Sequence, residues 1–243
     1  MVDPKRKVLL TLISAFGLGG TALVCAGYAW PAETACALAG FAGMETLPNG
    51  TLVGQSSSVA ERATFIELQS QAGERIKQTF GAPRARPLVV VRDSRTFWPL
   101  KLNDYASAAF VGSRACVLIG PQGQNVDVVA HELMHAELGH RVGHWRRSFD
   151  VPAWFDEGIA MQVDLRARYN WSNQQGNSND HGYVRQLKSQ GQFNDADDRQ
   201  LTRNYAAAKA EVARWLTTID RSELYHRLER IRVGDDFDAV LVR

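Results

Sequence analysis

Three residues that can bind and use a metal ion stand close together near the middle of the sequence. His131 and His135 are four positions apart with Glu132 between them, in the pattern H-E-x-x-H. Residues four apart lie on one face of an α-helix, so the two imidazoles can hold one ion, while Glu132 is turned toward a water molecule on that ion. This spacing is typical of metal-assisted hydrolysis with Glu132 as the general base.

A third ligand is needed, because a catalytic zinc ion normally has three protein ligands. The metzincin pattern H-E-x-x-H-x-x-G-x-x-H supplies it from a later Gly-x-x-His, but this chain has Leu138 and Arg141 at those two positions, which excludes that class. Glu157, in the segment W-F-D-E-G-I-A, is the better candidate. A helix that returns antiparallel to the first would bring its carboxylate to the two imidazoles.

With H-E-x-x-H followed by this W-x-x-E-G-x-A-like segment, residues 87–233 resemble the gluzincin metallopeptidases. The short length of this catalytic region is similar to that of the minigluzincins. The resemblance implies a zincin-like fold and a Zn²⁺ ion held by His131, His135 and Glu157. It also implies that the protein is an endopeptidase that hydrolyses a peptide or protein substrate. A further implication is an edge strand beside the cleft, for which residues 107–111 are the candidate.

The resemblance suggests two further roles. Gluzincins often use a Tyr or His from the C-terminal helices to stabilise the oxyanion of the tetrahedral intermediate. Tyr205 is the candidate here, and His181 is the alternative. Thermolysin-like members carry an Asp four residues after the Glu ligand to orient a His, but that position is Met161. Asp164 is the substitute that we expect to orient a ligand imidazole, while Asp156 is expected to be solvated.

The rival to an enzyme is a membrane-anchored binding or assembly module that keeps the metal for stability and has no turnover. A purely structural zinc site usually closes its fourth ligand position and needs no base. The presence of Glu132 between the two imidazoles therefore favours the enzyme.

The charge balance argues against nucleic acid as a partner. The 243 residues include 28 Lys and Arg against 26 Asp and Glu, and three of the basic residues lie within the first seven positions. Because the rest of the chain is balanced, we do not expect a basic face that holds nucleic acid. With 45% hydrophobic and 22% charged residues, the composition is that of a globular protein.

Residues 8–32 contain no charged side chain and follow the cluster Lys5, Arg6 and Lys7. At about 1.5 Å per residue, this stretch is long enough to cross a hydrocarbon core of about 30 Å. The basic cluster is expected to stay in the cytoplasm, which sends the rest of the chain across the membrane. We therefore predict that residues 1–32 anchor an extracytoplasmic domain, periplasmic or extracellular. Cleavage as a signal peptide, followed by secretion, is the alternative.

Two of the three cysteines lie beyond this membrane segment. Cys25 lies within it, which leaves Cys36 and Cys116 in a compartment where a disulfide can persist. They form either one bridge or two separate buried thiols, since the sequence does not show their distance.

The remaining pattern predicts an α+β domain with a small sheet, an active-site helix and a C-terminal helical subdomain. Residues 33–56 are expected to be an irregular linker or lead-in, and residues 57–243 the zinc peptidase-like domain. Helices are predicted from the capping box of Ser58 and Glu61 to Gly81, from Asn125 through the H-E-x-x-H motif, and over about 152–168, 202–218 and 222–232. Strands are predicted at 87–92, 107–111 and 115–119. Polar loops are predicted at 170–182 and 191–200. A solvated basic turn is predicted at Arg141, Arg146 and Arg147.

Overall fold

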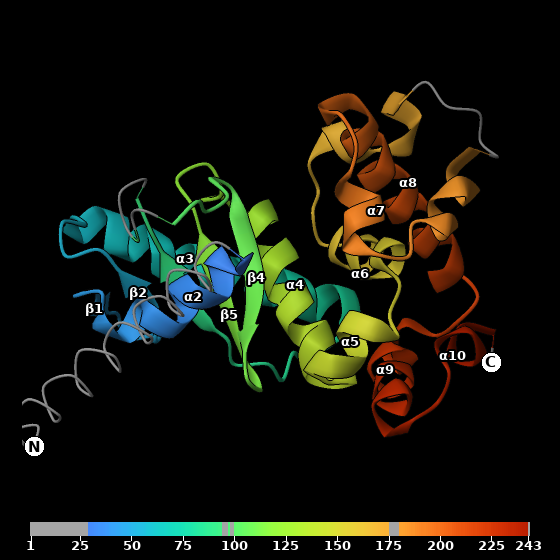
Figure 1. Cartoon of the computed structure of the whole chain (residues 1–243), viewed down its shortest axis with the longest axis horizontal. Helices are drawn as coiled ribbons and strands as arrows, with labels where there is room; N and C mark the ends of the chain where they lie inside the picture. The colour runs from blue at the N-terminus through green and yellow to red at the C-terminus, as the bar shows by residue number, and fades with distance from the viewer. Residues whose placement is uncertain (1–28, 94–96, 98–99, 175–179, 243) are drawn as a thin grey trace, which may run out of the picture.

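A computed structural model describes residues 29–93, 97, 100–174 and 180–242 of the chain. The predicted membrane segment, residues 1–32, lies outside these residues except for its last four. Among the described residues, no helix combines the length and the apolar character that crossing a bilayer requires. The described chain is an α+β structure, with a small sheet on one side, a group of helices on the other and α4 between them (Figure 1).

A five-stranded mixed sheet forms in the N-terminal half. Its strands are β1 (Glu45–Thr46), β2 (Leu52–Val53), β3 (Leu88–Val91), β4 (Ala106–Val111) and β5 (Arg114–Ile119), in the order β1-β2-β3-β5-β4. The three central strands are parallel, and β1 and β4 are antiparallel to their neighbours. β4 and β5 form the predicted hairpin around Gly112, whose φ of +61° favours glycine. The segment predicted as the edge strand is therefore at the edge of this sheet.

Helices cover both faces of the sheet. They are α2 (Pro31–Leu38) on one face, and α3 (Val59–Phe80) and α4 (Val126–Val142) on the other. Cys36 in α2 is disulfide-bonded to Cys116 in β5, with their Cα atoms 6.1 Å apart. Of the two alternatives for these cysteines, the structure has the bridge, which joins α2 to the centre of the sheet.

Side-chain caps determine where α3 and α4 begin. The Ser58 hydroxyl accepts a hydrogen bond from the backbone N–H of Glu61, and the backbone N–H of Ser58 donates to the Glu61 carboxylate at 2.7 Å. The side chain of Asn125 accepts from the backbone N–H of Val128 at 3.1 Å. Each cap satisfies amide groups that a first helical turn leaves without partners. Both helix starts predicted from the sequence are confirmed.

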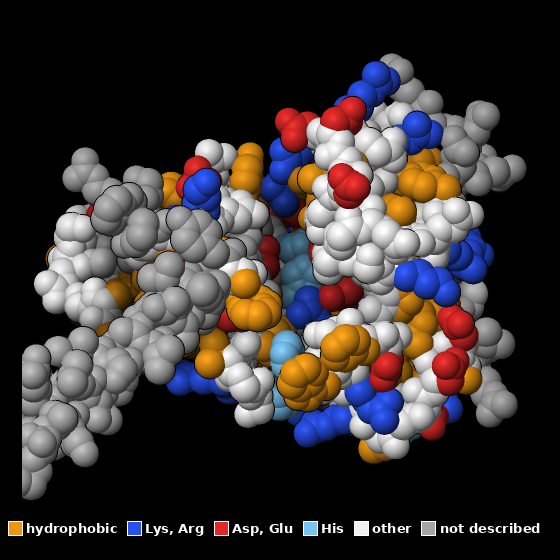
Figure 2. Space-filling view, viewed as in Figure 1, with side chains coloured by type: hydrophobic (Ala, Val, Ile, Leu, Met, Phe, Trp, Pro, Cys, Tyr) orange, Lys and Arg blue, Asp and Glu red, His pale blue; other side chains and the backbone are white. Residues whose placement is uncertain are grey.

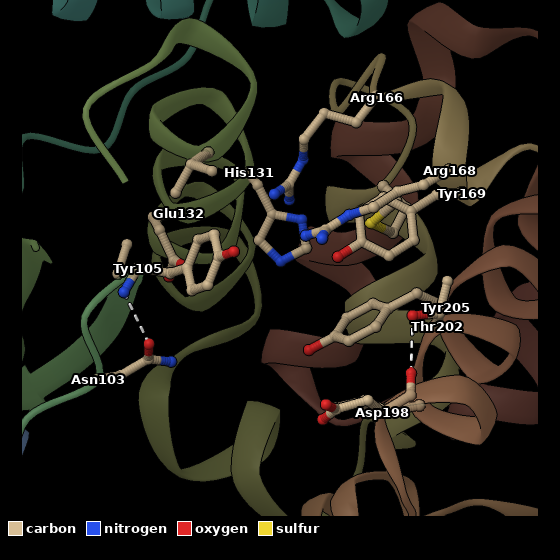
Figure 3. A pocket seen from close by; sticks show the side chains of 14 residues that line it. Asn103, Tyr105, His131, Glu132, Arg166, Arg168, Tyr169, Asp198, Thr202 and Tyr205 are labelled. Carbon is tan, nitrogen blue, oxygen red and sulfur yellow. Dashed lines mark hydrogen bonds between the residues drawn. The ribbon is translucent and has the colours of Figure 1, made fainter. Parts of the chain in front are cut away.

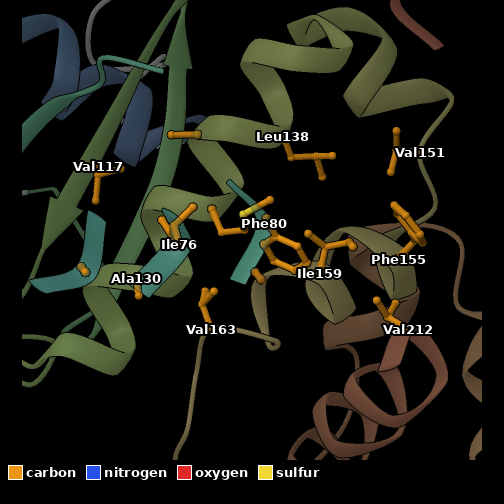
Figure 4. Close-up of a cluster of buried hydrophobic side chains, with 14 of the residues drawn as sticks. Ile76, Phe80, Val117, Ala130, Leu138, Val151, Phe155, Ile159, Val163 and Val212 are labelled. Carbon is orange, nitrogen blue, oxygen red and sulfur yellow. The ribbon is translucent and has the colours of Figure 1, made fainter. Parts of the chain in front are cut away.

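The C-terminal half is a layer of helices packed against α4. They are α5 (His144–Phe149), α6 (Ala153–Ala160), α7 (Gln190–Asn194), α8 (Asp198–Leu216), α9 (Leu224–Val233) and α10 (Phe237–Val242). α6 and α8 approach closely at Gly158, where a Cβ atom would lie 2.5 Å from Val212 and 2.6 Å from the carbonyl oxygen of Ala208. One cluster of buried apolar side chains runs from Val117 in the sheet through Leu138 in α4 to Val212 in α8 (Figure 4). The core therefore joins the two halves and holds α4 and α6 in fixed positions.

Residues 33–56 are part of this fold, so the expectation of an irregular linker is wrong. They contribute most of α2 and the strands β1 and β2. Leu52 and Val53 are buried, and Leu52 pairs with Val90 in β3. Strands of two residues are too short to show the alternation of apolar and polar side chains by which a strand is recognised in a sequence.

The helix predicted over 152–168 ends at Ala160, earlier than expected. Beyond it, the backbone N–H of Leu165 donates to the Asp127 carboxylate at 2.9 Å, not to a carbonyl one turn earlier. After the last helical hydrogen bond, from Met161 N–H to the carbonyl of Glu157, the chain therefore follows a non-helical path toward Asp127.

The two segments predicted as polar loops, 170–182 and 191–200, contain short helices in their described parts. The second segment includes most of α7 and the first turn of α8, and each of these helices starts at a side-chain cap, Ser189 or Asp197. α7 buries only Phe193. A helix that buries one side chain has no apolar stripe in its sequence, so the loop prediction is wrong here.

Candidate metal centre

His131 and His135 project from one face of α4 into a cleft between the two halves of the molecule. Their Nε2 atoms are 3.0 Å apart. Figure 2 shows histidine side chains at the bottom of a groove between the sheet side and the C-terminal helices. The structure therefore brings the two imidazoles of the H-E-x-x-H motif to one point.

Glu157 reaches the same point from α6. Its Oε2 atom lies 3.4 Å from His131 Nε2 and 3.3 Å from His135 Nε2. Its other oxygen, Oε1, accepts a hydrogen bond from Gln190 Nε2 at 3.0 Å, which fixes the orientation of the carboxylate. The three side chains form a buried group that could hold a metal ion, since their residues are only 7%, 5% and 6% exposed.

The three converging atoms fit a divalent cation. Two ligand atoms on one zinc ion, at about 2.0–2.1 Å and a tetrahedral angle, are separated by about 3.3–3.4 Å, which matches both distances to Glu157. His135 Nδ1 faces the Asp156 carboxylate at 2.7 Å, so in the neutral ring Nδ1 carries the hydrogen and Nε2 presents a lone pair. Glu157 Oε2 is buried and, among the described residues, accepts no hydrogen bond. Facing lone pairs in a buried site need a cation between them.

The charges around the imidazoles also favour a cation. Burial disfavours the charged form of His135, but the carboxylates of Asp156 and Glu157 outweigh it and raise the pKa of this imidazole to about 10. Burial likewise opposes ionisation of Glu157, yet the charge of His135 and the adjacent imidazole of His131 hold the pKa of its carboxyl well below the usual value. The site therefore stabilises positive charge between the three residues, carried either by a proton or by a metal ion.

Asp156, which the sequence predicted to be solvated, is buried behind His135 and positions it. Besides its contact with Nδ1, it binds Arg147 through Oδ2 at 2.7 Å. A carboxylate on the far nitrogen of a ligand imidazole fixes both the tautomer and the orientation of the ring. The prediction is wrong because all eight residues of α6 are buried, so the neighbour of Glu157 has no solvent-facing side available.

Asp164, predicted to orient a ligand imidazole, instead forms an ion pair with Arg166. Its two carboxylate oxygens accept from Arg166 Nε at 2.9 and 3.0 Å. His131 Nδ1 has no hydrogen-bond partner among the described residues. Because Asp164 lies beyond the end of α6, the helical spacing on which that prediction depended does not apply to it.

The cleft in front of the three residues has a volume of about 400 Å³. His131 and Glu132 line it from α4, Tyr105 lines it just before β4, and Tyr169 and Tyr205 line it from the C-terminal half (Figure 3). Glu132 thus faces the cleft beside a candidate ligand. This is the position that a general base for a bound water molecule needs.

Tyr205, on α8, lies across the cleft from α4. Its ring centroid is 6.2 Å from that of His131, and its hydroxyl points toward α4 (Figure 3). The charge of Glu157, burial and the charge of Glu132 raise the pKa of this phenol well above its usual value. The hydroxyl therefore keeps its proton at neutral pH and is available as a hydrogen-bond donor.

His181, the alternative to Tyr205, has a different environment. Its Nδ1 atom is 2.9 Å from a carboxylate oxygen of Glu211, and its ring packs edge-on against Trp171. It is not among the residues that line the cleft. Of the two candidates for the oxyanion donor, the structure places Tyr205 in the cleft.

Sequence reasoning missed three residues at this site: Arg147, Gln190 and Tyr169. Arg147 was predicted to lie in a solvated basic turn, whereas it binds Asp156 and its side chain is 13% exposed. Gln190 binds Glu157, and Tyr169 lines the cleft next to Tyr205. None belongs to a motif. The signal available in the sequence was the Asp-Glu pair at 156 and 157, since two adjacent carboxylates in an apolar helix require donors elsewhere.

The chain has no match among the families, curated proteins or solved structures with which it was compared.

Proposed function

We propose that this protein is a zinc-dependent peptidase of gluzincin type, with Zn²⁺ held by His131, His135 and Glu157. The observation that supports the proposal best is the convergence of the three ligand atoms within 3.0–3.4 Å of one another. Carboxylate and imidazole ligands in this number are those of a catalytic zinc site that keeps a position for water. Glu132 beside them gives the site a base, which a purely structural zinc site does not need.

In this proposal each residue has a separate task. A zinc ion in this site would lower the pKa of a water molecule toward about 7 and polarise the scissile carbonyl. Glu132 accepts the proton of that water and passes it to the leaving amine. Tyr205 donates a hydrogen bond to the oxyanion that develops across the cleft. Water is the nucleophile, so no acyl-enzyme forms.

The arrangement of the elements is compatible with a zincin-like fold. The helix with the H-E-x-x-H motif packs under the sheet, and the candidate Glu ligand lies on the second helix after it. β4 is an antiparallel edge strand whose start borders the cleft. The free edge of such a strand can pair with an extended peptide, which is how we propose that the substrate backbone is held.

We infer that the peptidase acts outside the cytoplasm, anchored by the uncharged stretch 8–32, or secreted if that stretch is cleaved. The disulfide between Cys36 and Cys116 supports this inference, because such bonds persist in oxidising compartments.

The test combines metal analysis with proteolysis of a peptide library by the purified full chain. Wild type is expected to bind one zinc ion and to cleave peptides, and Glu132→Gln is expected to keep the zinc and lose cleavage by at least about 10²-fold, because an amide cannot accept the proton. His131→Ala or His135→Ala should abolish zinc binding, while His140→Ala, an exposed position on the same helix, should leave it unchanged. If wild type binds zinc and is as inert as Glu132→Gln, the binding-module hypothesis is the better one.

A further inference from the structure

The short helix α5 carries two large apolar side chains on its outer surface. Trp145 and Phe149 are 73% and 77% exposed. They are one helical turn apart, and their rings are parallel within 4° with centroids 6.1 Å apart. Figure 2 shows apolar side chains gathered over α5, beside the groove. Contiguous exposed apolar side chains, unlike single ones, are a feature of interaction sites.

The uncharged stretch 8–32 leads directly into the folded domain. α2 begins at Pro31, so no polar spacer separates this stretch from the first helix. Trp30, at the junction, is 61% exposed. If the stretch is embedded in a bilayer, the end of the domain that carries the start of α2 must lie at the headgroups.

α5 lies next to that end of the domain. His144, its first residue, stacks on Phe110 of β4 with ring centroids 4.8 Å apart. α2 packs on the opposite side of this edge strand, because Phe110 points toward Gly139 of α4. Burial and Arg147 lower the pKa of His144, and the charge of Glu33 in α2 opposes them, which places α2 within electrostatic reach of α5. The aromatic pair and the start of α2 therefore flank the β4 edge of the sheet from its two sides.

We propose that the Trp145–Phe149 face of α5 docks on the bilayer that holds the N-terminal segment. Tryptophan is enriched at the membrane–water interface, where its ring sits among the headgroups. The side chain of Arg146, which lies between the two aromatic residues in sequence, is 42% exposed and bound to Asp150 at 2.9 Å, and it can exchange this partner for anionic headgroups. This proposal rests on the membrane segment inferred above and adds a second contact, made by the folded domain itself.

Docking through α5 would fix the position of the cleft relative to the membrane. The inner side of the same helix carries Arg147, which binds Asp156 behind His135. The docking face and the candidate metal centre thus lie on opposite sides of a six-residue helix. The substrates favoured by this arrangement are peptide segments close to the bilayer surface.

The test measures the environment of position 149 in the full chain. The chain, with Cys25→Ala, is incorporated into vesicles of phosphatidylcholine and phosphatidylglycerol, and a nitroxide is attached at Phe149→Cys. The matched control is Val59→Cys, an 83% exposed apolar position on α3, which covers the other face of the sheet. The ratio of collision rates with oxygen and with a water-soluble nickel chelate is then measured by electron paramagnetic resonance.

The label at position 149 is expected to show an oxygen-to-nickel ratio several-fold higher than the label at position 59. Equal ratios at the two positions, in a chain that stays with the vesicles after alkaline carbonate washing, would overturn docking and leave the membrane segment intact. Release of the chain by carbonate would overturn both. Spin–spin broadening at position 149 would show that a second copy of the chain covers this face, which also overturns the proposal.

Discussion

Helix α4 carries two buried pairs of ionisable residues with the same spacing but different surroundings. His131 and His135 meet Glu157, while Glu137 and Arg141 form an ion pair two turns further along the helix at 2.6 Å. In both places a carboxylate is removed from water. The surroundings of that carboxylate are what distinguish the two regions.

Glu137 is fully buried, and donors satisfy both of its oxygens. The backbone N–H groups of Arg84 and Ala85 and the Nε of Arg141 donate to it at 2.6–3.1 Å. Glu157, in contrast, has one oxygen bound by Gln190 and one that faces only imidazole nitrogens. A buried carboxylate whose oxygens all accept hydrogen bonds stabilises the fold. A buried carboxylate with an oxygen directed at other lone pairs is suited to bind a cation.

The same comparison corrects the prediction of a solvated basic turn. Arg141 is 4% exposed, binds Glu229 as well as Glu137, and stacks on the Tyr225 ring with its Cζ 4.0 Å from the centroid. Arg147 is half-buried, and each of these two arginines binds a carboxylate from another element. Of the three arginines, Arg146 is the one whose side chain remains largely in water, at 42% exposure.

The largest expected effect is on stability, at the ion-pair end of α4. Glu137→Ala removes the acceptor of Arg141 Nε and of the backbone N–H groups of Arg84 and Ala85, so the free energy of unfolding should fall by about 3–5 kcal/mol. Urea denaturation followed by circular dichroism measures this change. The zinc content of the chain that remains folded should be unchanged.

Two further variants make that comparison sharper. Glu229→Ala removes a partly exposed partner of Arg141 and should cost only about 0–1 kcal/mol. Glu157→Ala should abolish zinc binding but destabilise the metal-free chain less than Glu137→Ala, since Glu157 Oε2 accepts no hydrogen bond from the described residues. If Glu137→Ala and Glu157→Ala destabilise the chain equally in the presence of a chelator, the two carboxylates contribute equally to the fold, which contradicts this prediction.

The next effect is on catalysis. In the proposed mechanism Tyr205 donates a hydrogen bond to the oxyanion only in the transition state, so Tyr205→Phe should reduce kcat by about 10²–10³ with little change in KM. Steady-state kinetics on a peptide that the wild type cleaves measures it. His181→Ala is the control and should keep kcat, given that this side chain is bound to Glu211. Full activity in Tyr205→Phe would mean that Tyr205 acts only as an aromatic residue of the core, and Tyr169 would be the next candidate donor to test.

A smaller effect is expected from the residue behind the candidate ligand. Asp156→Asn keeps a hydrogen-bond acceptor for His135 but removes the charge, so zinc affinity should fall by about 10–100-fold. Competition with a chelator of known affinity measures the change. Asp164→Asn, at the position predicted from the sequence, should leave the zinc affinity of the folded chain close to that of wild type. The reverse result would restore Asp164 as the orienting residue.

The sequence predicted the parts of this site that depend on local rules. Helix periodicity places His131 and His135 on one face, and the caps at Ser58 and Asn125 locate the long helices, because the decisive contacts there lie within four residues. The β4–β5 hairpin has the same local character, since its turn is set by Gly112. These predictions are confirmed.

The parts that the sequence did not predict depend on long-range packing. Whether Asp156 is solvated or buried depends on the helices that surround α6. The path of the chain after α6 involves a hydrogen bond from Leu165 to Asp127, which is far away in sequence. The pairing of β2 with β3 involves a single register pair, Leu52 with Val90. No periodicity within a short segment contains this information.

The final prediction concerns the pH dependence of zinc binding. In the metal-free chain the pKa of His135 is about 10, above the ordinary 6.5. Because the folded chain binds this proton more tightly than the unfolded chain, protonation of His135 stabilises the fold. The stabilisation is complete below about pH 6.5 and is lost as the pH rises through about 10. Between these limits a metal ion must displace the proton, so zinc affinity should rise by about tenfold per pH unit from this group. Chelator competition at several pH values measures the slope.

In Asp156→Asn the largest charge that raises this pKa is removed, so the slope should flatten at a lower pH than in wild type. Identical profiles for the two chains would show that His135 does not hold the displaced proton.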